Sequence, residues 1–198
     1  MFIAERLVCA PAMQRAGILS LLAVPSAFLS HYVARDPWDV FFIGGRSLLP
    51  GVYFALVLSI GALAWATKSK FEVLTVFLLT VLAWFLAVEA TLSVHTFLKE
   101  ATGPLGPPLD PSSLTYPKKA LSGMVGGLVG ASITVYGVSL AQQQFRNVQD
   151  WIRTIAIGGI AGVFLELESQ HSLLPLFLVW QPSVAASIGY GLRAGEKS

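Results

Sequence analysis

Six runs of mostly apolar residues recur along the 198-residue chain, and their length is the feature that most restricts its fold. A helix needs about 20 apolar residues to cross the roughly 30 Å hydrocarbon core of a bilayer, because each residue rises by about 1.5 Å. The runs lie at about 16–33, 47–67, 71–95, 120–141, 153–168 and 172–192. The sequence therefore predicts an all-α protein, a polytopic membrane helix bundle with about six transmembrane helices in one transmembrane domain, residues 1–198.

Composition supports this class and argues against others. Only 12% of the residues are charged and 55% are apolar, whereas a soluble domain carries about 25% charged residues. The net charge of +2 is too small to favour a nucleic-acid partner. Because the chain is so apolar, we expect its partners to be the lipid bilayer and other membrane-protein subunits. Cys9 is the single cysteine, which excludes an intrachain disulfide and a multi-cysteine metal site.

The first run has two interpretations. Arg6 and Arg15 precede it, and small residues follow at Ser26 and Ala27, as in a cleavable secretory signal. The long leader before the run and its apolar continuation to Val33 favour a retained helix. The sequence leaves both interpretations open.

A proline-rich segment, residues 96–119, separates the third run from the fourth. Five prolines and two glycines fall between Gly103 and Pro117. Because proline lacks a backbone N–H and fixes φ, this composition favours an extended surface loop over a helix. Residues 68–70, in contrast, form so short a connection that the second and third runs are expected to pair as an antiparallel hairpin.

If the runs alternate in direction, the protein has two faces. We name the first the terminal face, because it would hold both termini together with residues 68–70 and 142–153; the second, with the other connections, is the loop face. Eight lysines and arginines fall on the terminal face and five on the loop face. Cytoplasmic loops carry the excess of these residues. This bias predicts a plasma or inner membrane protein with cytoplasmic N- and C-termini.

Small residues recur every fourth position in the later runs. The lines are Ser122, Gly126, Gly130 and Thr134, with Gly123, Gly127 and Ala131 beside them, and Thr154, Gly158, Gly162 and Glu166 in the fifth run. Such spacing lets helix backbones approach closely in lipid. We therefore expect the fourth, fifth and sixth runs to pack together, with Gly126, Gly130, Gly158 and Gly162 at the contacts.

The candidate ligand or proton site lies where the third and fifth runs reach the loop face, with Glu89, His95, Glu166 and His171. Only 16 residues separate Glu72 from Glu89, or about 24 Å of helix, so one of these glutamates is expected at or inside the membrane boundary. Ionisable groups there are costly and commonly functional. The alternative is a hydrated carboxylate among lipid head groups.

Gln181 is the remaining site candidate. It precedes Pro182 in the middle of the last run, where proline removes a helical hydrogen bond and should kink the helix. Gln181 could then contact a polar ligand, while a kink that serves packing alone is the alternative.

Catalytic motifs such as GxSxG, HExxH and the Walker loop do not occur in the sequence. The three histidines, His31, His95 and His171, follow different apolar runs, so a bis-histidine haem would need ligands from two helices, and no cofactor is assigned. Three hypotheses remain. The first is a transport or permease-like component with a polar pocket toward the loop face. The others are a non-catalytic accessory or assembly subunit and a small haem or redox membrane enzyme.

Overall fold

The computed structural model describes residues 10–34, 42–43, 46–66, 69–101, 115–142, 145, 147–167 and 173–192. Six α-helices dominate this part: α2 (Ala12–Val33), α3 (Leu49–Gly61), α4 (Lys70–Ala101), α5 (Thr115–Ala141), α6 (Val148–Gly162) and α7 (Leu174–Gly191). A π-helical turn (Ala62–Ala66) continues α3, and a 3-10 turn (Val163–Leu167) continues α6. The two-residue strands β1 (Phe42–Ile43) and β2 (Arg46–Ser47) pair antiparallel ahead of α3. The predicted all-α class is confirmed.

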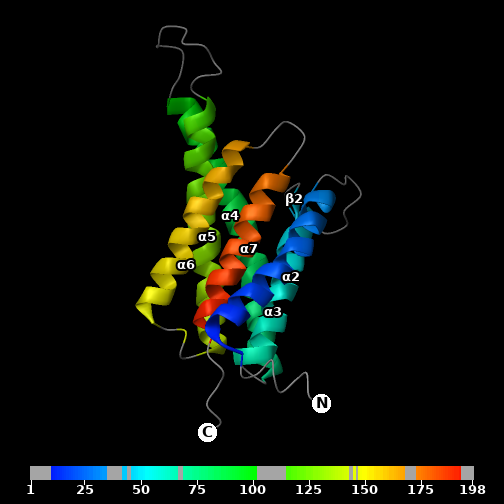
Figure 1. Ribbon diagram of the computed structural model, residues 1–198. Helices are drawn as coiled ribbons and strands as arrows, with labels where there is room; N and C mark the ends of the chain where they lie inside the picture. Colours follow the sequence, from blue (N-terminus) through cyan, green and yellow to red (C-terminus); the bar gives the residue numbers. More distant parts are fainter. Residues whose placement is uncertain are drawn as a thin grey trace.

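The six helices form a closed ring of neighbours. Neighbours follow the order of the chain from α2 to α7, and α7 packs against α2 to complete the circle. The start of α2 and the end of α7 lie at the same end of the bundle (Figure 1). We call this end the terminal face, and the other end, where α2, α4 and α6 finish, the loop face.

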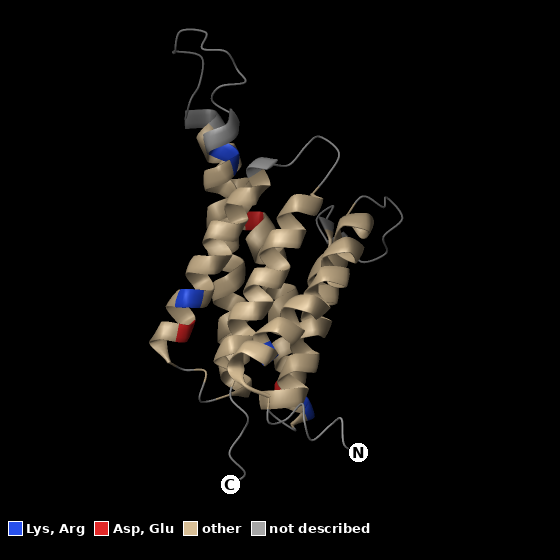
Figure 2. Cartoon of the chain, in the orientation of Figure 1, with Lys and Arg blue, Asp and Glu red and all other residues tan. Residues whose placement is uncertain are grey.

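Five of the helical segments are long and apolar enough to cross a membrane: residues 12–33, 49–66, 70–98, 118–141 and 148–165. Figure 2 shows how little of the described ribbon is charged. The remaining helix, α7, carries Gln181, Pro182 and Ser183 among its apolar residues, and it runs unbroken through Pro182. The chain is therefore a helical membrane protein.

The structure corrects the boundaries of the predicted proline-rich loop. Helix α4 continues through residues 96–101 and α5 begins at Thr115, so the segment 96–119 is helical at both ends, and residues 102–114 lie outside the described part. Pro117 fits because it lies in the first turn of α5, where backbone N–H groups have no helical acceptor to lose.

Helix α6 also begins earlier than predicted, at Val148 instead of about residue 153. The side chain of Asn147 accepts a hydrogen bond from the backbone N–H of Gln149 at 3.1 Å and caps the helix. Asp150 in the first turn adds a favourable interaction with the helix dipole. The polar residues before Trp151 thus start the helix instead of forming a loop.

Helix α5 packs against α6 through one of its two lines of small residues. A Cβ on Gly127 would collide with the backbone carbonyl of Gly158, and a Cβ on Gly123 with that of Gly162. Since neither contact leaves room for a methyl group, the two helix backbones touch directly, as van der Waals packing in lipid favours.

The second line of small residues on α5 packs against α4. A Cβ on Gly126 would meet Thr91 Oγ1 and the carbonyl of Ala87 on that helix, and Gly130 lies against Ala87. Helix α5 makes few contacts with α7. Of the contacts expected among the fourth, fifth and sixth runs, those between α5 and α6 and between α6 and α7 are present, while α5 barely contacts α7. The second glycine line of α5 packs instead on α4, which the sequence did not predict.

Candidate functional site

A cavity of about 460 Å³ lies inside the helix ring, among the ends of the helices at the loop face. All six helices or the turns next to them contribute to its wall, from Ala34 at the end of α2 to Leu173 at the start of α7. Ligand pockets commonly have volumes of about 300–1,000 Å³ and an apolar lining with a few polar groups. The size and place of this cavity fit a small-molecule site.

Aromatic side chains form the apolar wall of the pocket. Trp84 and Phe177 pack with their ring centroids 5.4 Å apart, and Pro50 and Leu176 extend the same lining. The indole nitrogen of Trp84 donates to the backbone carbonyl of Ser47 at 3.1 Å, which fixes the ring. This wall is therefore rigid and offers no free donor from Trp84.

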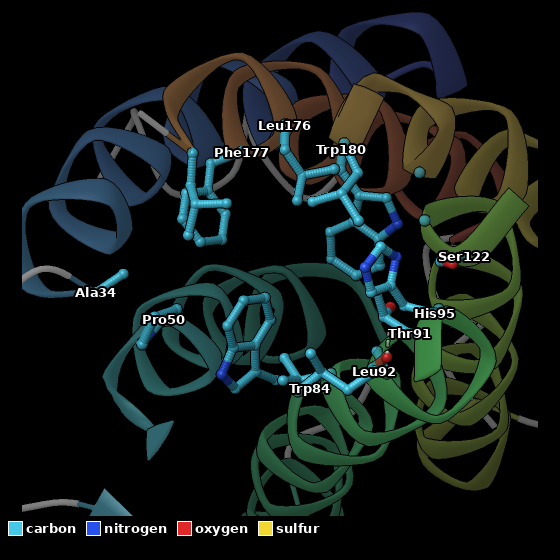
Figure 3. Close-up of a pocket in the computed structure, with 18 of the residues that line it drawn as sticks. Ala34, Pro50, Trp84, Thr91, Leu92, His95, Ser122, Leu176, Phe177 and Trp180 are labelled. Carbon is cyan, nitrogen blue, oxygen red and sulfur yellow. Dashed lines mark hydrogen bonds between the residues drawn. The ribbon is translucent and has the colours of Figure 1, made fainter. Parts of the chain in front are cut away.

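Four lining residues with polar side-chain atoms lie on the side of the pocket next to α5 (Figure 3), and we call them the polar corner: Thr91, His95, Ser122 and Trp180. Ser47, beside Trp84, is a polar lining residue outside this corner. The hydroxyl of Thr91 donates to the Ala87 carbonyl at 2.8 Å, and that of Ser122 donates to the Lys118 carbonyl at 2.7 Å. Both hydroxyl protons are thus used within their own helices, and each oxygen keeps capacity to accept a hydrogen bond.

Trp180 supplies a donor that the described residues leave unused. Its side chain lines the pocket, it is only 9% exposed, and its Nε1 is buried without a hydrogen-bond partner in the described part of the chain. The ring is held by Phe54, with centroids 5.4 Å apart, and lies near Gly130. A buried N–H without a partner costs about 1–3 kcal/mol, which an acceptor on a bound molecule would offset.

Two nitrogen-bearing side chains also line the pocket. Lys119, near the start of α5, contributes an ammonium group, and His95 adds an imidazole with donor and acceptor nitrogens. The lining thus combines a largely apolar surface with a small number of polar side chains.

The core is closed below the pocket. Toward the terminal face the ring is filled by side chains that are 2% exposed or less, among them Leu19, Leu58, Val135, Val138 and Ile188. Protein interiors of this kind pack as densely as organic crystals. The packed core thus closes the terminal-face side of the pocket.

A polar network joins α6 to α7 near the terminal face. Arg153 pairs with Asp150 at 2.9 Å, donates to the hydroxyl and carbonyl oxygens of Ser187 at 3.2 and 3.1 Å, and lies 4.5 Å over the ring of Tyr190. Thr154 and Ser187 join through their hydroxyls at 2.8 Å. All these groups are mutually satisfied, so the network holds two helices together.

Gln181, expected as a possible ligand contact, is not among the pocket-lining residues. It is 1% exposed and lies between α7 and α2. Its amide oxygen accepts from the Ser26 hydroxyl at 2.8 Å, and its amide nitrogen donates to Ser30 Oγ at 2.9 Å. The side chain thus bridges two helices.

Some of the other predicted site residues line the pocket and others do not. His95 lines the pocket, as do Gly126 and Gly162, whereas Glu89 does not. Glu89 shares a helix face with Leu78, Leu82 and Leu86, which are 56%, 44% and 37% exposed, so it lies toward the outside of α4.

The structure describes two more of the predicted site residues only in part or not at all. Glu166 belongs to the 3-10 turn after α6, but its side chain lies outside the described residues, as does all of His171. Within the described part, no three His, Cys, Asp or Glu residues come together as a metal site. The pocket therefore depends on side chains that the sequence did not single out, Trp84, Thr91 and Phe177 above all, because aromatic and hydroxyl residues in an apolar run carry no motif.

Comparison with protein-family models, curated proteins and solved structures finds no match to this chain.

Proposed function

We propose that this protein is the small-molecule-binding component of a membrane transport system, and that it takes up its ligand from the loop face. The observation that carries the proposal is the cavity of about 460 Å³ inside the helix ring. A transport component must expose a binding site to one side of the membrane while closing the other, and the packed core below the pocket has this effect.

The proposal also includes the side of the membrane on which each face of the bundle lies. The excess of lysine and arginine on the terminal face supports a cytoplasmic location for both termini, so the pocket would open to the non-cytoplasmic side of a plasma or inner membrane. Association with other membrane-protein subunits stays a prediction, which copurification in mild detergent would test.

A pocket-filling substitution tests the proposal. Val88 lines the pocket on α4, so Val88→Trp should occupy much of the space that a ligand needs. Leu82→Trp is the matched control, because Leu82 is 44% exposed on the outer face of the same helix. The measurement is mass spectrometry of small molecules extracted from the purified proteins.

We expect a bound molecule in the wild type and in Leu82→Trp, and its loss in Val88→Trp. Equal amounts of the same molecules in all three proteins would show that nothing specific occupies the pocket, and the proposed function would be wrong.

A further inference from the structure

Aromatic rings that are already held in place make up much of the pocket wall. Trp84, Phe85, Phe177 and Trp180 all line it. The Trp84 indole is fixed by its hydrogen bond to the Ser47 carbonyl at 3.1 Å, and its ring packs against Phe177 with centroids 5.4 Å apart. Aromatic rings attract one another in offset and edge-to-face arrangements beyond what the burial of apolar area contributes. A ligand built on flat rings therefore gains contacts here that a saturated chain does not.

The rigidity of the wall favours a rigid ligand. Trp180 packs against Phe54 with ring centroids 5.4 Å apart, and it is only 9% exposed. A flexible chain loses rotational freedom at each of its bonds when it fills a fixed space, whereas a fused ring system has no such freedom to lose. We therefore expect a ring compound to bind more tightly than an open chain of the same size.

The polar corner lacks one hydrogen-bond acceptor. Trp180 Nε1 can only donate a hydrogen bond, and it is buried without a partner among the described residues. The hydroxyls of Thr91 and Ser122 donate to carbonyls of their own helices at 2.8 and 2.7 Å, so they can accept from a ligand but their protons are in use. Figure 3 shows the Trp180 indole nitrogen on the same side of the cavity as His95 and Thr91.

A carbonyl oxygen supplies the missing acceptor with the fewest further demands. It offers two lone pairs and, unlike a hydroxyl, brings no proton that needs an acceptor in return. We propose that the pocket binds a largely apolar ring compound whose rings lie against Trp84 and Phe177 and whose carbonyl oxygen accepts a hydrogen bond from Trp180 Nε1. This inference rests on the proposed function and deepens it by naming the class of ligand.

The inference makes Trp180 the residue that determines specificity. A ring hydrocarbon of the same shape as the ketone leaves the buried indole N–H without a partner, while the ketone satisfies it. Sites built to hydrogen-bond a ligand reject analogues that lack the matching group for this reason.

Three uncharged probes test the inference: fluorenone, fluorene, and an open-chain ketone with as many carbon atoms as fluorenone. Fluorene has the fused rings of fluorenone with a methylene group in place of the carbonyl, and the open-chain ketone keeps the carbonyl without the rings. Each is titrated into the purified protein in detergent by isothermal titration calorimetry. We expect fluorenone to bind about tenfold more tightly than fluorene, the range of one buried hydrogen bond, and more tightly than the open-chain ketone.

A substitution at Trp180 assigns the preference to one donor. Trp180→Phe keeps an aromatic ring and removes the N–H, so fluorenone should lose its advantage over fluorene, and fluorene should bind at least as well as to the wild type. Trp151→Phe is the control, because that indole donates to the Phe145 carbonyl at 3.0 Å near the terminal face, and it should keep the tenfold preference. Partition of the probes into detergent micelles is the same for every variant, so a changed ratio of affinities reports the contact with the protein.

The outcomes distinguish this inference from the proposed function. Equal affinities of fluorenone and fluorene for the wild type, an unchanged preference in Trp180→Phe, or tighter binding of the open-chain ketone would each overturn the ligand class. If no probe binds while another molecule copurifies with the wild type and is lost in Val88→Trp, the ligand class is wrong and the binding function stands.

Discussion

At the scale of single residues, glycine determines how closely the helices approach. Gly123, Gly127, Gly158 and Gly162 bring two backbones into direct contact, and their spacing in the sequence was sufficient to predict a helix interface. The sequence could not show that Gly126 and Gly130 serve a different partner, because every line of small residues looks alike until its neighbour is known. The prediction that Gln181 contacts a ligand was wrong for a related reason. The sequence shows a polar residue in an apolar run, but it does not show that the partners of this residue are Ser26 and Ser30 of another helix.

The glycine contacts lead to a stability prediction. Gly127→Ala should destabilise the protein by about 1–3 kcal/mol, since overpacking forces helices apart, and lower the melting temperature by several degrees. Gly17→Ala, where nothing lies within 4 Å of the added methyl group, should leave it unchanged or raise it, because alanine is the better helix former. Thermal unfolding in detergent measures both, and equal melting temperatures would contradict direct backbone contact.

At the scale of elements, the order of neighbours around the ring follows the order of the chain, and short connections made part of it predictable. The pairing of the second and third runs followed from residues 68–70 alone. Contact between α2 and α7 could not be deduced in this way, because their sequence separation is large and the residues that join them, Ser26, Ser30 and Gln181, are ordinary polar residues in apolar surroundings.

The bridge between α2 and α7 gives the second stability prediction. Gln181→Ala removes two hydrogen bonds and leaves the Ser26 and Ser30 hydroxyls without this partner, so the folded state should lose about 1–3 kcal/mol. Ser132→Ala is the control, since that hydroxyl donates only to Leu128 of its own helix at 2.7 Å. Should both variants melt at the same temperature, Gln181 would have no bridging role.

At the scale of the whole molecule, the number and the approximate positions of the helices were accessible from apolar run length, since about 20 residues are needed to cross lipid. The pocket could not be predicted from the sequence, because its wall is formed by side chains from all six helices. Residues as distant in the sequence as Ala34 and Leu173 come together only in the folded protein. His95 was predicted from its polarity, whereas Trp180 was not predicted as a site residue, because a tryptophan in an apolar run has no distinguishing pattern.

Sidedness of the pocket can be measured by thiol labelling. In a Cys9→Ser background, Leu92→Cys places a thiol in the pocket wall at a position that is 40% exposed, and Val135→Cys places one in the packed core, where Val135 is fully buried. A membrane-impermeant maleimide added from the non-cytoplasmic side should label the first and not the second. Labelling of Leu92→Cys only from the cytoplasmic side would reverse the assigned orientation.

The contacts between neighbouring helices divide the ring into two groups. Glycine contacts unite α4, α5 and α6, while α2 packs extensively against α7. Arg153 crosses the joint between these two halves near the terminal face, where it reaches Ser187 and Tyr190. Any change in the angle between α6 and α7 would therefore have to break the contacts of Arg153 with Ser187 and Tyr190. Because α6 and α7 both contribute to the pocket wall, such a change would also alter the shape of the pocket.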